Sequence, residues 1–118
     1  MAKSLLIISR QSPWSGPAAR EALDIVLAGG AFDLPIGLLF LDDGVLQLAA
    51  GQNAMAVQQK DLSANLQALP MFGVEELFYC ADSASARGLG EFSLDEAAPL
   101  AAEQITALID RYDQVITL

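Results

Sequence analysis

The sequence predicts an α/β protein with a mostly parallel sheet and helices on both faces of that sheet. Short apolar runs, typical of strands buried on both faces, alternate along the chain with longer segments whose apolar residues recur at helical spacing. Alternation of this kind forms βαβ units, and the preference for right-handed crossovers limits the ways of joining them. The chain has 118 residues and shows no linker or internal repeat, so we expect one domain over residues 1–118.

The first half of the chain supplies two strands and a helix. Residues 3–9 (KSLLIIS) and residues 35–41 (PIGLLFL) are short continuous apolar runs, which indicate buried strands. The segment between them predicts a helix with one apolar face. Gly29-Gly30 should end this helix, because glycine is favoured just beyond a helix C-terminus. The core residues expected from the helix are Ala19, Leu23, Val26 and Leu27.

The second half of the chain continues the alternation. Its predicted elements are a short helical turn over 45–50, a helix over 55–69, a strand over 75–80, a short helix over 83–87 ended by Gly88, a short strand over 93–98, a helix opened by Pro99 and a strand over 113–118. The last helix should bury the face made of Ala101, Ile105, Leu108, Ile109 and Tyr112. Five strands joined in this way predict a flavodoxin-like three-layer fold with the strand order 2-1-3-4-5.

Charge and composition exclude several functions. The net charge is −9 and the six cationic residues are scattered singly, so neither direct nucleic-acid binding nor an anionic membrane surface is expected. No stretch approaches 18 consecutive apolar residues, and the first residues are too short an apolar run for a signal peptide. One cysteine allows no internal disulfide, which favours a reducing cytoplasm.

Missing residue types and motifs restrict the chemistry further. The chain has no histidine, no CxxC pair and no phosphate-binding glycine motif, so we expect no metal, no cofactor and no self-contained enzyme. Charged residues make up 18%, against about 25% in typical domains, and hydrophobic residues make up 53%. Two interpretations stay open: a permanent subunit contact, or a helical surface rich in alanine.

The predicted strand order directs attention to one edge of the sheet. Ligands of open parallel sheets bind beyond the carboxyl ends of the strands, where the strand order reverses. In the order 2-1-3-4-5 that point lies between the first and third strands, so residues 10–16 (RQSPWSG) and Cys80 should be neighbours. A backbone nest in residues 10–16 could bind an anion, and an ordinary strand-to-helix loop is the alternative.

Cys80 is the candidate catalytic residue, with two interpretations. A thiol at the start of a short helix can be activated as a thiolate, although the nearby Asp82 opposes this. Free cysteine is also among the most frequently buried residue types, which favours a structural role. Asp42-Asp43 similarly has two interpretations, an acidic metal pocket or ordinary turn chemistry before Gly44. A short apolar turn over 45–50 would suit a partner subunit if it lay on the surface.

Three stretches together resemble a known family. FLDDGVLQLAAGQ (residues 40–52) is similar to the segment after the second strand of the TusC/DsrF proteins, in the DsrE/DsrF/DsrH-like group. FGVEELFYCADSASARGL (residues 72–89) resembles their third strand, with its cysteine and a following S-x-x-x-RGL pattern. PLAAEQITALIDRYDQVITL (residues 99–118) matches the layout of their final helix and strand. The likeness runs nearly end to end.

The resemblance implies a subunit of the TusBCD complex, a heterohexamer with TusB-like and TusD-like partners. That complex passes persulfide sulfur toward 2-thiolation of the wobble uridine in tRNA, and the TusC branch is taken to serve assembly. Related DsrEFH complexes act in sulfur oxidation, so a DsrEFH-type role with Cys80 as persulfide carrier is one alternative. A flavodoxin-like module that binds a small ligand is another. The family's established sulfur-carrying cysteine belongs to the TusD/DsrE subunit, so the position of Cys80 does not transfer that role.

Overall fold

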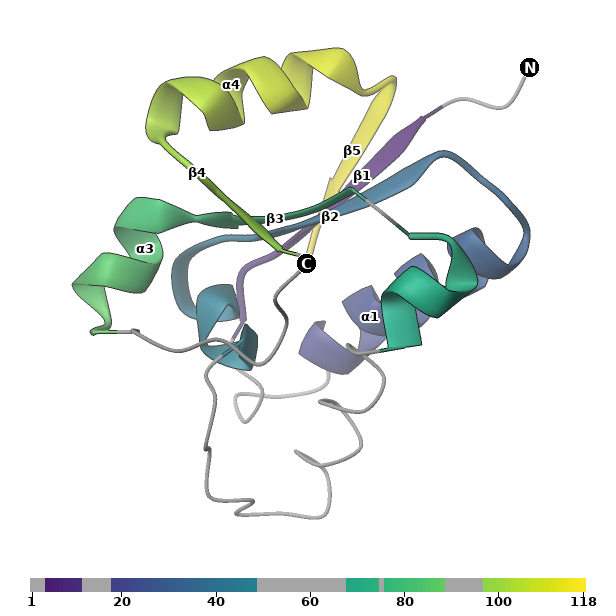
Figure 1. Ribbon diagram of the computed structural model, residues 1–118, viewed down its shortest axis with the longest axis horizontal. Coiled ribbons are helices and arrows are strands. Elements are labelled where there is room, and N and C mark those ends of the chain that lie inside the picture. Colours follow the sequence, from purple (N-terminus) through teal and green to yellow (C-terminus); the bar gives the residue numbers. More distant parts are fainter. Residues whose placement is uncertain (1–3, 12–17, 49–67, 75, 89–96) are drawn as a thin grey trace.

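The described residues form a five-stranded, fully parallel sheet with helices on both faces (Figure 1). The computed structural model describes residues 4–11, 18–48, 68–74, 76–88 and 97–118. The strands are β1 (Leu5–Ser9), β2 (Ile36–Phe40), β3 (Glu76–Cys80), β4 (Ala98–Leu100) and β5 (Gln114–Thr117). The α/β fold class is therefore confirmed.

The strand order is β4-β3-β2-β1-β5, which differs from the predicted order 2-1-3-4-5. The chain adds β2, β3 and β4 in one direction from β1, and then returns across the sheet to place β5 on the other side of β1. A right-handed crossover made in the opposite direction puts its helix on the opposite face. Figure 1 accordingly shows α4 (Ala102–Arg111) on one face of the sheet and α1 (Ala18–Ala31) on the other.

Helix α1 runs through Gly29-Gly30 instead of ending there, so the predicted stop is wrong. Both glycines are needed because other parts of the chain lie very close to this part of α1. A Cβ at Gly29 would lie 2.8 Å from the Cδ1 atom of Ile36, and a Cβ at Gly30 would lie 2.6 Å from Val74 Cγ2. The two glycines therefore let the last turns of α1 lie directly against the neighbouring chain.

Short helices connect the remaining strands. They are η1 (Asp42–Leu48), η2 (Leu69–Phe72) and α3 (Ala81–Ala86). The predicted apolar turn over 45–50 falls largely on η1, where Val45 and Leu48 are fully buried. The condition for a partner surface, that this turn lie on the outside, is therefore not met by these two residues. The predicted helix over 55–69 lies mostly outside the described residues.

The end of the chain also differs from its prediction at one proline. Pro99 lies within β4 and does not open the last helix, and β4 begins at Ala98, the last residue of the predicted fourth strand. The position suits proline because β4 pairs with β3 alone, at the edge of the sheet, where a missing N–H is tolerated. Of the face predicted for the helix that follows, Ile105 and Leu108 are buried, Ile109 and Tyr112 are half-buried, and Ala101 is exposed.

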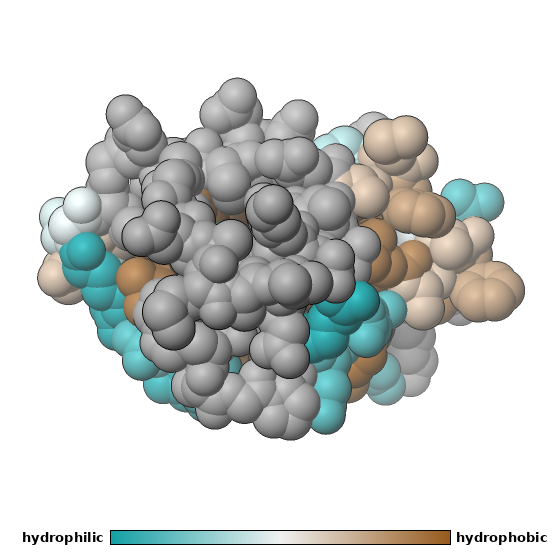
Figure 2. Space-filling model, turned by 90° about the horizontal axis from the view of Figure 1, so that it is seen from below, coloured by the Kyte–Doolittle hydropathy of each residue, from teal (hydrophilic) through white to brown (hydrophobic). Residues whose placement is uncertain are grey.

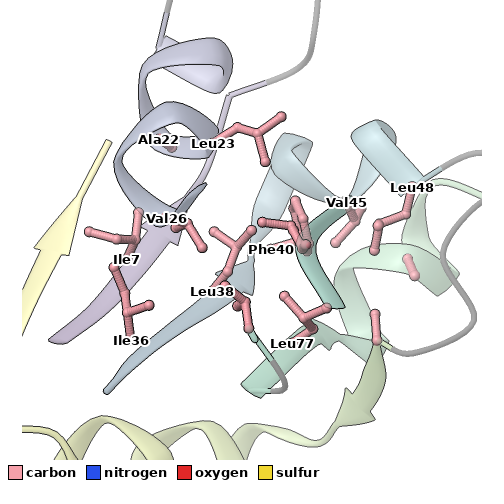
Figure 3. Packing of buried hydrophobic residues seen from close by; sticks show 14 residues of the cluster. Ile7, Ala22, Leu23, Val26, Ile36, Leu38, Phe40, Val45, Leu48 and Leu77 are labelled. Carbon is pink, nitrogen blue, oxygen red and sulfur yellow. The ribbon is translucent and has the colours of Figure 1, made fainter. Parts of the chain in front are cut away.

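The core has two parts, one on each face of the sheet. On one face, alternate residues of β1 and β2 pack beneath α1, and Figure 3 shows Ile7, Leu38 and Phe40 on the side of Leu23 and Val26. On the other face, a smaller cluster of Leu6, Ile8, Leu39, Cys80, Ile105 and Leu108 lies under α4. The cysteine is therefore part of the packing beneath the last helix.

Candidate functional site

The carboxyl edge of the sheet is the candidate site, because the segments that follow β1, β2 and β3 meet there. The first residue after β2 lies beside β1: the Leu41 N–H donates to the Ser9 carbonyl at 3.0 Å. The chain then turns at once, since the Gly44 N–H donates back to the Leu41 carbonyl at 2.9 Å. This turn starts η1 and brings its polar side chains onto the ends of the neighbouring strands.

Gly44 is required by this packing. It is buried, and a Cβ at this position would overlap the carbonyl oxygen of Ser9, which belongs to the backbone and cannot move aside freely. The glycine therefore allows η1 to lie directly against the end of β1. This close contact fixes the position of the acidic pair that precedes it.

Gln47 is a buried polar residue that the sequence reasoning missed. Its Nε2 donates to Ser9 Oγ at 2.7 Å and to the Gln11 carbonyl at 3.1 Å. Ser9 and Gln47 are both buried, so this pairing satisfies groups that would be costly to leave alone. The signal in the sequence was a single glutamine inside the apolar turn VLQLAA.

Asp42 and Asp43 are each paired with an arginine from a neighbouring segment. Arg10 Nε donates to Asp42 Oδ2 at 2.8 Å, and Arg87 Nε donates to Asp43 Oδ1 at 2.9 Å. Asp42 has a left-handed backbone with φ of 52°, and its N–H donates to Ser83 Oγ at 3.1 Å. The acidic pair thus joins the three strand ends, and the described residues contain no cluster of three or more metal-ligating side chains.

Cys80 ends β3 and caps α3. The residue is 7% exposed. Its Sγ accepts a hydrogen bond from the Ser83 N–H, with 3.4 Å between Sγ and the nitrogen. The thiol therefore satisfies one of the free N–H groups at the start of the helix, as a serine or aspartate cap would. Leu100 and Ile109 pack against the same cluster from β4 and α4.

The structure corrects the predicted juxtaposition of residues 10–16 and Cys80. Both follow strands at the same edge, but β2 lies between β1 and β3. The segment Asp42–Gly44 occupies the gap, and residues 12–16 lie outside the described part of the chain. The segment after β1 and the segment after β3 are thus linked through Asp42, which pairs with Arg10 and donates its N–H to Ser83.

A shallow pocket of about 360 Å³ marks the point where the strand order actually reverses, between β1 and β5. Its lining residues are Arg10, Gln11, Asp42, Asp43, Thr117 and Leu118. Two carboxylates line it and Arg10 is already paired with Asp42, so the described part of this pocket is poorly suited to a phosphate. Within the same described residues, no helix is both long and apolar enough to span a bilayer.

Comparisons with known proteins give the chain a family. The model of the DsrE/DsrF-like family matches residues 3–118. The Protein TusC homolog of Pseudomonas aeruginosa is 66% identical over 119 residues, which cover 100% of both chains. The intracellular sulfur oxidation protein DsrF of Allochromatium vinosum is 38% identical over 96 residues, covering 81% of this chain and 71% of that protein.

A solved structure supports the fold independently of close sequence similarity. The crystal structure of the ychN protein from E. coli superposes with a TM-score of 0.76 and covers 100% of both chains, at 16% sequence identity. With a family model that spans nearly all of the sequence, the conclusion is direct: the chain belongs to the DsrE/DsrF-like family.

Proposed function

We propose that this chain is a non-catalytic, single-domain subunit of a cytoplasmic sulfur-relay complex, assembled with TusB-like and TusD-like partners. The complex would pass persulfide sulfur toward 2-thiolation of the wobble uridine in tRNA. The full-length identity of 66% to a TusC homolog supports the choice of this branch of the family. The net charge of −9 supports a division of labour in which another protein holds the tRNA.

The burial of Cys80 is the observation that carries the non-catalytic assignment. A sulfur carrier needs a thiolate that a donor can reach, whereas Cys80 is 7% exposed and its Sγ accepts a hydrogen bond from the first turn of α3. The sequence offers no histidine and no second cysteine to assist it. The structure of the described residues therefore supports a role in capping α3 and packing under α4.

A second candidate function is sulfur trafficking of the DsrEFH type, with Cys80 as a persulfide carrier. The identity of 38% to a DsrF protein favours this pathway, and the place of Cys80 at a strand end favours the chemistry. In that reaction the Cys80 thiolate would attack the outer sulfur of a donor persulfide. A new Cys80 persulfide would form and the donor would leave as a thiolate.

Two substitutions at Cys80 separate the roles. Cys80→Ser keeps an atom that can accept from the Ser83 N–H, whereas Cys80→Ala removes the cap. For a structural cysteine we expect wild-type sulfur transfer from both variants within the assembled complex. The free energy of unfolding should fall by about 1 kcal/mol for Cys80→Ala and by less for Cys80→Ser.

The measurement is transfer of labelled persulfide sulfur through the reconstituted complex, with assembly followed by size-exclusion chromatography. Loss of transfer in both variants, with assembly intact, would establish Cys80 as a carrier and overturn the non-catalytic assignment. A wild-type chain that stays monomeric when mixed with TusB-like and TusD-like partners would overturn the proposed complex itself.

A further inference from the structure

Four large apolar side chains are exposed at the amino edge of the sheet, opposite the candidate site. They precede β2 and β3, and we call them the amino-edge patch: Phe32 (79% exposed), Leu34 (47%), Met71 (88%) and Phe72 (46%). Figure 2 shows apolar residues gathered at the end of the molecule where Figure 1 places η2 and the end of α1. Contiguous exposed apolar surface of this kind marks interaction sites.

The patch is one surface because α1 and η2 are held together. A Cβ at Gly30 would lie 2.9 Å from the Phe72 carbonyl oxygen, so the two backbones are in close contact. The turn after α1 is fixed by the Leu34 N–H, which donates to the Gly29 carbonyl at 2.9 Å. Hydrogen bonds of the chain itself thus hold the apolar side chains on the outside.

A pocket continues from the patch and has a volume of about 340 Å³. Its apolar wall includes Leu34, Pro35 and Ile36, and its polar wall includes Ser4, Glu76 and Arg111, with Gly73 and Tyr112 completing the lining. Leu34 belongs to both the patch and the pocket, so an apolar side chain seated in the pocket would also contact the patch. An anchor in a pocket, surrounded by flatter apolar surface, is the usual organisation of a strong protein contact.

The unpaired charge that the described residues place beside the patch is negative. Asp33 lies between Phe32 and Leu34, is exposed, and forms no ion pair with a described residue. The arginine on the pocket wall, Arg111, lies 3.5 Å from Glu76 and is therefore already paired with a carboxylate. Every arginine of the chain is similarly paired with a carboxylate. Among the described residues, the unbalanced charge that a partner meets here is therefore acidic.

We propose that the amino-edge patch docks a different polypeptide chain, which inserts an apolar side chain into the pocket and places lysine or arginine opposite Asp33. The inference rests on the proposed function, because the partner is one of the other subunits of the complex. A second copy fits less well. A symmetric contact would bring the same acidic surface of two chains of charge −9 together.

The test uses the intact chain and the purified TusB-like and TusD-like chains from the same genome. Phe32→Glu and Met71→Glu each put a charge in the patch at an exposed position, so the fold should be retained. Ala107→Glu adds the same charge at an exposed position of α4 and is the matched control. Asp33→Asn removes the acidic charge, and Asp110→Asn on α4 is its control.

We expect Phe32→Glu and Met71→Glu to raise the Kd for the partner chains about tenfold or more, with Ala107→Glu unchanged. Asp33→Asn should weaken binding several-fold and reduce its salt dependence, with Asp110→Asn unchanged. The measurements are biolayer interferometry at two salt concentrations and far-ultraviolet circular dichroism of each variant.

Each other outcome overturns a stated part of the proposal. Wild-type affinity in both patch variants would reject the patch as the docking surface while the proposed function stands. A wild-type chain that binds neither partner would reject the proposed function and the docking surface with it. A wild-type dimer that Met71→Glu converts to a monomer would identify a second copy as the occupant and reject a different chain.

Discussion

The two edges of the sheet differ in how completely the chain satisfies its own groups. At the carboxyl edge, Gln47 pairs with buried Ser9, and both aspartates of the turn are held by arginines. At the amino edge, large apolar side chains lie exposed before β2 and β3. The hydroxyl of Tyr112 is also buried there without a hydrogen-bond partner among the described residues. Among the described residues, the carboxyl edge presents paired polar groups around a shallow pocket, whereas the amino edge presents exposed apolar side chains.

This difference reverses the usual expectation for an open parallel sheet. Such folds normally bind their ligands beyond the carboxyl ends of the strands. Here the described carboxyl edge uses its polar groups to hold three strand ends together, and the exposed apolar surface lies at the opposite edge. Among the described residues, the exposed apolar surface therefore lies at the amino edge, which agrees with the proposed function.

The largest expected effect comes from the close packing at the carboxyl edge. Gly44→Ala would drive a Cβ into the Ser9 carbonyl, and we expect a loss of about 3 kcal/mol in the free energy of unfolding. Gly73→Ala at the amino edge is the matched control. It has φ of 84° but open space around it, so it should cost only about 1 kcal/mol. Urea denaturation measures both, and equal losses would contradict the difference between the edges.

A smaller effect is expected from the buried polar pair. Gln47→Leu keeps the bulk of the side chain but leaves the Ser9 hydroxyl and the Gln11 carbonyl without their donor, which should cost about 2 kcal/mol. Adding Ser9→Ala removes one unsatisfied group and should recover about 1 kcal/mol. A double-mutant cycle by urea denaturation checks this. Strictly additive losses would show that the two side chains do not interact.

The smallest effect belongs to Tyr112 and has the opposite sign. Its hydroxyl rests against Gly37 and has no hydrogen-bond partner among the described residues, so Tyr112→Phe should stabilise the fold by about 1 kcal/mol. Tyr79→Phe, which alters the other tyrosine of the chain, is the control and should bring no gain. Thermal unfolding of the two variants decides the matter. A loss of stability in Tyr112→Phe would show that the hydroxyl is satisfied after all.

The same residue predicts a dependence on pH. Burial of the ring, and secondly the charge of Glu76, raise the pKa of Tyr112 above its ordinary value of 10.0, with Arg111 opposing them. The unfolded chain therefore loses this proton first, so the contribution is fully present below pH 10.0 and is lost as the pH rises toward the folded pKa. Tyr112→Phe should lose less stability than the wild type above pH 10.0.

Apolar periodicity predicted the kind and the place of most elements. The runs in residues 3–9 and 35–41 contain β1 and β2, and the helical spacing around Leu108 produced α4. Local sequence could not predict the burial of Val45 and Leu48, because the same apolar turn suits either a surface contact or a core. At the candidate site, the sequence identified Cys80 and the aspartates but not Gln47, whose partners lie 38 and 36 residues away.

The sequence by itself determined that this protein is an α/β sheet protein with a lone cysteine at a strand end, because these properties depend on local periodicity and residue type. Only the tertiary structure decided the strand order, the continuation of α1 through Gly29-Gly30 and the burial of Cys80. Each of these features depends on which segment, distant in the sequence, packs against the residues concerned. The return of the chain from β4 to β5 carries α4 across the sheet, and that helix covers the thiol.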